Sequence, residues 1–159
     1  MRDFFIQAVI DDQCEAVVNE LAIGRDPNAP DEFGWIPLHR AAANNSVAVA
    51  KILLEAGSSL SATGTDAWTP LHLASVSGSA EVVEMLIAAG ADPDALSVFG
   101  DTPLHLCVTS CDVRAAEMLL RAGANPHVLN RKGLSPLAKA RNKRCAAIAD
   151  LLEGFGKRK

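Results

Sequence analysis

Three histidines recur at a fixed interval and are the first residues that could carry chemistry. His39, His72 and His105 follow one another at steps of 33 residues, and an imidazole can bind a metal or act as an acid or base. A metal needs ligands that converge within a few ångströms, whereas this spacing puts one imidazole in each structural unit. We therefore interpret the three histidines as structural groups that hydrogen-bond to the neighbouring turn and tie one unit to the next.

The cysteines form no recognisable metal or disulfide framework. Cys107 and Cys111 lie four residues apart near His105, which gives at most three soft zinc ligands and no fourth, so zinc is the less favoured alternative. No Cys-x-x-Cys spacing or paired framework is present. The sequence therefore predicts that Cys14, Cys107, Cys111 and Cys145 are all free thiols in a reducing compartment.

No catalytic motif emerges from the remaining polar residues. The chain has no glycine-rich phosphate loop, no Gly-x-Ser-x-Gly turn and no His-Glu-x-x-His. Its carboxylates are scattered over positions expected to face solvent. The sequence predicts a protein that is not an enzyme and that needs no cofactor and no metal.

The segments that carry the histidines are themselves repeated. Residues 69–74 read Thr-Pro-Leu-His-Leu-Ala, and close variants occupy residues 36–41, 102–107 and 135–140. Their prolines are Pro37, Pro70, Pro103 and Pro136, at steps of 33 residues. A fixed period of this size is typical of a solenoid whose units each contact only their neighbours.

One unit, residues 64–96, predicts two helices. Thr69 can cap the first helix with its hydroxyl, and Pro70 suits the first helical position. That helix runs to about Ser77, and a second runs from about Ala80 to Ala89, where Gly90 ends it. In the preceding unit Ile36 replaces the capping hydroxyl, so that helix lacks a side-chain cap.

This pattern resembles the ankyrin repeat, on residues 69–74, on Glu-Val-Val at 81–83 and on Gly-Ala-Asp-Pro at 90–93. The resemblance implies an all-α solenoid of five stacked helix-loop-helix repeats with β-hairpin-like loops. We expect one domain over residues 1–153, with repeats at 1–30, 31–63, 64–96, 97–129 and 130–153, and a flexible basic tail at 154–159. Polar residues in the first and last repeats indicate that these act as caps of a complete array.

The residues that differ between repeats are the candidates for binding. Four aromatic residues fall in the loops just before the Pro-Leu-His segments: Phe33, Trp35, Trp68 and Phe99. The same loops carry Asp31, Glu32, Asp66 and Asp101. In ankyrin repeats such loop tips, together with the exposed face of the first helix, line a concave groove; here that face would add Arg40, Asn44 and Ser77.

Exposed aromatic residues on loop tips favour a binding ridge, because tryptophan is enriched at interface hot spots. The alternative is that some rings fold back onto the neighbouring loop. The predicted partner is a protein with apolar anchors flanked by Lys or Arg, held by the middle three repeats. We expect a monomeric regulator or adaptor in the cytoplasm or nucleus. A scaffold or assembly subunit that binds through convex or end surfaces is the alternative function.

Three other features weigh on the choice of partner. The net charge is −4, yet residues 130–159 hold nine Lys or Arg against two acids. A solvated basic cap is favoured there over a nucleic-acid site, because the rest of the chain is acidic and Phe155 is the only aromatic residue in that unit. The sequence contains no run of about 20 apolar residues, so it predicts no membrane span. Asn28 lies in the slot that asparagine hydroxylases modify in ankyrin repeats, although Glu20 stands where such sites usually carry Leu.

Overall fold

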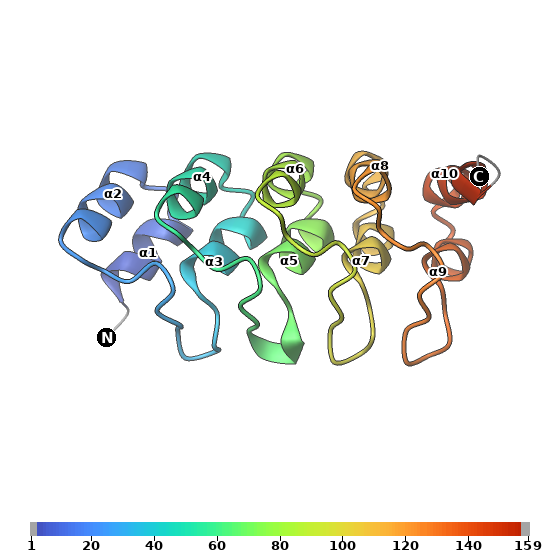
Figure 1. The fold of residues 1–159 in the computed structure, drawn as a ribbon, viewed down its shortest axis with the longest axis horizontal. Coiled ribbons are helices and arrows are strands. Elements are labelled where there is room, and N and C mark those ends of the chain that lie inside the picture. The colour runs from blue at the N-terminus through green and yellow to red at the C-terminus, as the bar shows by residue number, and fades with distance from the viewer. Residues whose placement is uncertain (1–2, 157–159) are drawn as a thin grey trace.

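The computed structural model describes residues 3–156, which form ten α-helices and one short 3-10 turn. Figure 1 shows the helices as pairs that stand side by side in one row, each pair next to its sequence neighbours. The helices are α1 (Phe4–Ile10), α2 (Cys14–Ala22), α3 (Pro37–Ala43), α4 (Val47–Glu55), α5 (Pro70–Ser77), α6 (Ala80–Ala88), α7 (Pro103–Ser110), α8 (Val113–Arg121), α9 (Pro136–Lys143) and α10 (Ala146–Gly156), with the turn η1 (Thr65–Ala67) before α5. The prediction of an all-α solenoid of five repeats is confirmed.

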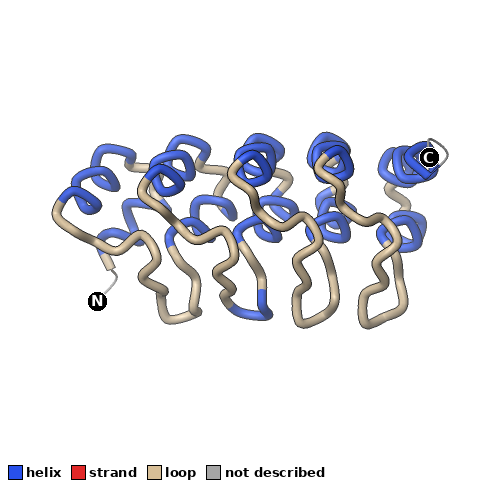
Figure 2. Tube along the Cα trace, in the orientation of Figure 1, coloured by secondary structure: helices blue, strands red, loops and turns tan. Residues whose placement is uncertain are grey.

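The loops between pairs project past the first helices, and Figure 2 shows them as a second row beside the helical one. Each loop is closed by the same backbone hydrogen bond, for example from the Asp31 N–H to the Trp35 carbonyl at 3.0 Å. No residue of the described part of the chain is assigned to a strand. The loops therefore resemble hairpins only in the hydrogen bond that closes them. We call the surface formed by these loops and the first helices the concave face.

The first helices begin as the repeated motif predicts. Thr69 and Thr102 cap α5 and α7 by accepting a hydrogen bond from the third helical N–H, and Ser135 caps α9 in the same way. Ile36 caps α3 without a side-chain hydrogen bond. A proline at the first helical position removes one of the N–H groups that would have no partner within the helix.

The histidines bridge neighbouring repeats, so their structural interpretation is confirmed. The Nε2–H of His39 donates to the Trp68 carbonyl at 2.9 Å, and that of His105 donates to the Leu134 carbonyl at the same distance. His72 makes the equivalent bond to the Asp101 carbonyl at 3.1 Å. Each Nδ1 accepts the backbone N–H at the start of its own helix, so both ring nitrogens are used in the neutral form.

The core runs through every repeat without interruption. Leucines of the second helices, Leu53, Leu86 and Leu119, are completely buried, and small alanines let the first helices approach one another. In the first repeat Glu20 occupies the slot of these leucines, and in the last repeat residues 141–144 are exposed. α10 extends to Gly156, so residues 154–156 of the expected tail are helical, while 157–159 lie outside the described residues.

The prediction of four free thiols is wrong for two of them. Cys111 and Cys145 form a disulfide with their Cα atoms 6.0 Å apart, which is within the range for such bonds. The reason is the period itself, because residues about one repeat apart in sequence are neighbours in the stack. Cys14 and Cys107 are free thiols as predicted.

The buried histidines give the fold a pH dependence. Burial lowers the pKa of His39, His72 and His105, and the hydrogen bonds to carbonyls oppose this without overcoming it. The unfolded chain, with histidine pKa values of about 6.5, then binds more protons than the folded one as pH falls below that value. The contribution of the three neutral imidazoles to stability is therefore fully present above about pH 7 and is lost as pH falls through their lowered pKa values.

We expect the thermal midpoint, followed by circular dichroism, to fall steadily between pH 7.5 and pH 5. Replacing the exposed His127 by Gln should leave this slope unchanged. A midpoint that stays level over this interval would show that the buried imidazoles do not control stability.

Candidate functional site

The loop before α3 is held rigid by one carboxylate. Oδ1 of Asp31 accepts the backbone N–H of Phe33 at 2.9 Å and that of Trp35 at 3.0 Å. Its other oxygen, Oδ2, accepts from Nε and Nη2 of Arg40 on α3, with the Nε bond at 2.9 Å. Burial alone would raise the pKa of Asp31, but these hydrogen bonds outweigh it and lower the pKa. Asp31 therefore remains ionised and fixes the loop to its helix.

Arg40 also holds the two aromatic rings of this loop. Its guanidinium lies 4.5 Å from the centre of the Trp35 ring and 5.6 Å from that of Phe33, both within the range of a cation–π interaction. Phe33 nevertheless remains 57% exposed. The arrangement presents an apolar ring to solvent with little freedom to move, which lowers the entropy lost on binding.

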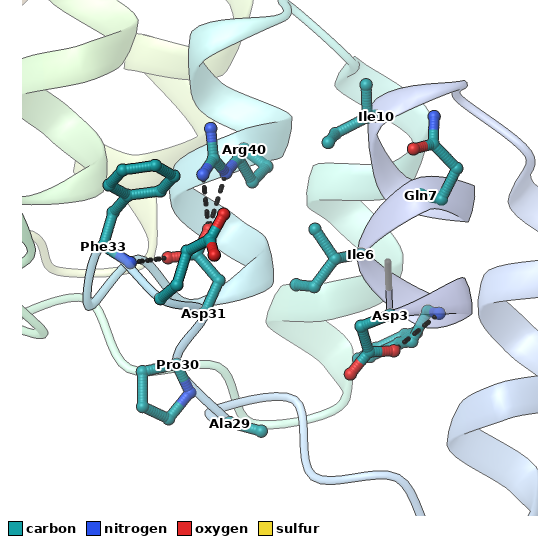
Figure 3. Close-up of a pocket in the computed structure, with 11 residues that line it drawn as sticks. Asp3, Ile6, Gln7, Ile10, Ala29, Pro30, Asp31, Phe33 and Arg40 are labelled. Atoms are coloured by element: carbon teal, nitrogen blue, oxygen red, sulfur yellow. Dashed lines mark hydrogen bonds and ion pairs between the residues drawn. The ribbon is translucent and has the colours of Figure 1, made fainter. Parts of the chain in front are cut away.

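A hollow of about 660 Å³ lies between α1 and this loop. Figure 3 shows Ile6 and Ile10 on α1, across from Asp31 and Phe33. Glu32 and Asp3 add carboxylates to its lining, and Asp3 is paired with Arg25 outside it. The hollow thus combines apolar walls with acidic groups.

Sequence reasoning missed the α1 side of this hollow. A signal was present, because Ile10 lies 33 residues before Ala43. It therefore occupies a slot on the exposed face of the first helix, where the other repeats hold Ala43, Val76, Thr109 and Asn142. A large apolar residue at that slot distinguishes the first repeat.

The two tryptophans are half-buried and pack against the core. Trp35 lies directly on the next loop, where a Cβ added to Gly64 would come within 1.9 Å of its Cδ1 atom. Trp68 is stacked on His72, with ring centres 6.4 Å apart. Trp35 therefore folds back onto the neighbouring loop. This is the alternative that the sequence left open for some of the aromatic rings.

The other aromatic and acidic candidates differ in how free they are. Phe99 is 52% exposed, and Asp66 is exposed at a turn where its φ is 60°. Asp101, in contrast, accepts from Nδ2 of Asn130 at 2.8 Å and pairs with Nζ of Lys139 at 3.4 Å. Asp101 therefore links the fourth repeat to the fifth and is already occupied by partners within the chain.

The helix candidates do not form a single cluster. Arg40 belongs to the Asp31 cluster, whereas Asn44 is exposed and donates to the Ile10 carbonyl at 3.3 Å. Ser77 is exposed at the end of α5. The structure thus brings Asp31, Phe33, Trp35 and Arg40 together and leaves the remaining candidates spread over three loops and two helices.

Three exposed apolar residues on the later loops were also missed: Leu96, Val98 and Leu129. Leu129 is 63% exposed. The sequence signal is the difference between repeats at one position, because Leu96 and Leu129 stand where the first repeat ends in Pro30 and the second in Thr63.

The remaining candidates are largely occupied within the chain. The side chain of Asn28 accepts from the Ser59 N–H at 2.7 Å and donates to the Gly57 carbonyl at 3.2 Å, so it connects the first two loops. Among the basic residues of the last repeat, Arg141 pairs with Glu153 at 2.7 Å. Burial lowers the pKa of Lys139, which remains paired with Asp101.

Within residues 3–156 no three His, Cys, Asp or Glu side chains lie together as a metal-binding group. Across the same residues, none of the helices has both the length and the apolar character to cross a membrane.

Comparison with protein families identifies the repeat. A model described as ankyrin repeats in three copies matches residues 5–97, and a model of a single ankyrin repeat matches residues 99–131. The chain belongs to the ankyrin-repeat family, and the resemblance seen in the sequence is confirmed. Ankyrin-repeat domains are typically non-catalytic and generally mediate protein–protein interactions. Comparison with curated proteins gives no match.

The contact between Trp35 and Gly64 gives a test of the site's rigidity. Gly64→Ala puts a methyl group into space that the indole fills, so the ring must move away from Arg40 or the two loops must separate. We expect a loss of about 1–3 kcal/mol in the free energy of unfolding, measured by urea denaturation, together with a change in tryptophan fluorescence.

Gly154→Ala is the matched control, because nothing lies within 4 Å of its added Cβ and Gly154 is in α10. This variant should be neutral or slightly stabilising. If both variants unfold at the same urea concentration as the wild type, the packing of Trp35 on Gly64 contributes nothing.

Proposed function

We propose that this chain is a regulator or adaptor that binds one partner protein through its concave face and loop tips. The observation that carries the proposal is the exposed Phe33, held by the Asp31–Arg40 cluster beside the hollow that Ile6 and Ile10 line. An exposed ring on a fixed support gains apolar contact on binding at little entropic cost. The proposed class of protein carries out no reaction.

The residues divide into contacts and supports in this proposal. Phe33 and Phe99 supply the main apolar contacts, with Glu32, Asp66, Asn44, Ser77 and the exposed edges of Trp35 and Trp68 around them. Asp31, Arg40 and Asp101 hold the loops in place through their hydrogen bonds and ion pairs. The free carboxylates favour a partner segment with an apolar side chain next to Lys or Arg. We place this binding in the cytoplasm or nucleus, with the chain as a monomer.

The test removes exposed rings without touching the core. Phe33→Ser with Phe99→Ser should leave folding intact, whereas alanine at the tryptophans would also remove core packing. We expect affinity capture of the partner, followed by titration with the purified partner, to show a loss of about thirtyfold or more.

Ile23→Ser is the control, since Ile23 is 77% exposed on the first repeat but lies outside the lining of the hollow. This variant should bind like the wild type. Equal binding by the double phenylalanine variant and the wild type would reject the concave face as the interface.

A second candidate function is a scaffold or assembly subunit that binds through its convex or end surfaces. The observation that favours it is Val18 on α2, which is exposed in a slot that the later repeats fill with charged Lys51, Glu84, Glu117 and Asp150. Phe4 is also exposed on the first repeat, at 61%.

Light scattering after size exclusion separates the two functions. The concave-face proposal expects a monomer at every concentration and no effect of Val18→Glu. A dimer in the wild type that Val18→Glu dissociates would favour the assembly function instead.

A further inference from the structure

Two cysteines fasten the last two repeats to each other. Cys111 follows α7, Cys145 precedes α10, and their disulfide spans 34 residues that include α8 and α9. It is the only disulfide in the part of the chain that the structure describes. The bond therefore holds the terminal repeat on its single neighbour.

The backbone at Cys111 is in the left-handed region, with φ at 56°. Every repeat has a positive φ at this slot, and the other residues there are Asp12, Asn45, Gly78 and Arg144. Gly, Asn and Asp tolerate the conformation, whereas cysteine has no such advantage. The conformational cost of a cysteine at this position is therefore present in the oxidised protein, where the bond to Cys145 offsets it.

The two cysteines differ in their exposure to solvent. Cys111 is exposed, whereas Cys145 is only 6% exposed. Cys107, one turn earlier in α7, is completely buried, and burial raises its pKa to about 12. A thiolate that arrives from solvent can therefore attack Cys111, while Cys107 takes no part because it stays protonated and covered.

We propose that Cys111 and Cys145 form a thiol–disulfide exchange site for low-molecular-weight thiols such as glutathione, and that this site sets how firmly the fifth repeat is held. An exposed disulfide of this kind is more readily reduced than a buried one. Such a bond is compatible with a reducing compartment if it forms and breaks reversibly there.

The reaction balances with glutathione as the only co-reactant. One glutathione thiolate attacks Sγ of Cys111, the bond to Cys145 breaks, and the sulfur of Cys145 leaves as a thiolate that takes a proton from water. A second glutathione thiolate then attacks the glutathione sulfur of the mixed disulfide and releases Cys111, which is protonated in turn. Two electrons pass to the protein and one glutathione disulfide forms; oxidation is the reverse.

Without the covalent bond the fifth repeat depends on non-covalent contacts with the fourth. These contacts include the bonds of Asp101 to Asn130 and Lys139, the bond from His105 to the Leu134 carbonyl, and apolar packing between the helices. Terminal repeats contact one neighbour and open most easily. Closing a loop of this length favours the folded state by on the order of a few hundredfold.

Opening of the fifth repeat also changes the contacts of the loop in the fourth repeat. The Phe99 carbonyl accepts the Arg131 N–H at 2.9 Å, so opening of the fifth repeat frees the loop that carries Phe99. Any effect on partner affinity rests on the proposed function, whereas the exchange reaction and the opening of the fifth repeat do not.

The experiment equilibrates the full chain in glutathione buffers of graded redox ratio, traps thiols with N-ethylmaleimide and maps them by mass spectrometry. We expect a Cys111–Cys145 bond at oxidising ratios, trapped thiols at both of these cysteines at millimolar reduced glutathione, and mixed disulfide at Cys111 rather than Cys145. Hydrogen exchange of residues 136–155 should be about a hundredfold faster in the reduced protein, and that of residues 37–88 should not change.

Three variants make the result specific. Cys145→Ser should exchange like reduced protein in both buffers, and Cys14→Ser should keep the full redox response. Cys111→Gly suits the left-handed backbone, so its fifth repeat should open less often than that of the reduced wild type.

Three outcomes would each overturn the proposal. A bond that resists millimolar glutathione in the folded protein would be a permanent crosslink. Thiols that never pair at any ratio would remove the site. Equal hydrogen exchange of residues 136–155 in both states would show that the bond does not hold the repeat.

Discussion

The hydrogen bond from each buried imidazole to the next repeat sets the geometry of the whole array. His39, His72 and His105 each accept an N–H at the start of their own helix and donate to the carbonyl just before the next one. One side chain thus fixes both the first turn of a helix and its distance from the following repeat. Because the ring must be neutral to make both bonds, the same interaction that stacks the repeats also makes the stack sensitive to acid.

The sequence predicted the scaffold well because the scaffold is periodic. The helices, their caps and the role of the histidines follow from residues that recur at the same slot, and any one repeat could be checked against three others. The known short spacings of cysteines do not predict the Cys111–Cys145 bond, whereas the period does, because the separation of 34 is one repeat plus one residue. In a stacked protein, residues at equivalent positions of adjacent repeats lie next to each other in space.

The candidate site was predicted only in part, because exposure is decided by side-chain packing that the period does not specify. Trp35 and Phe33 occupy the same loop, yet the indole packs on Gly64 while the phenyl ring remains exposed. The contact of the indole with the next loop depends on the glycine at residue 64, where the other repeats have Asp31, Ser97 and Asn130. Those three side chains each bind two N–H groups of their own loop, and the glycine cannot.

The glycine at residue 64 also limits how the array can be rearranged. Elsewhere a loop is supported by its own Asp, Ser or Asn, so a repeat could be exchanged for another with its loop intact. The second and third repeats differ, because Trp35 of one needs the bare backbone of the other. If the second repeat were joined to one that carries Asp, Ser or Asn at this position, a side chain would meet the Trp35 ring. An exchange of repeats therefore has to move the second and third together if the contact of Trp35 with residue 64 is to survive.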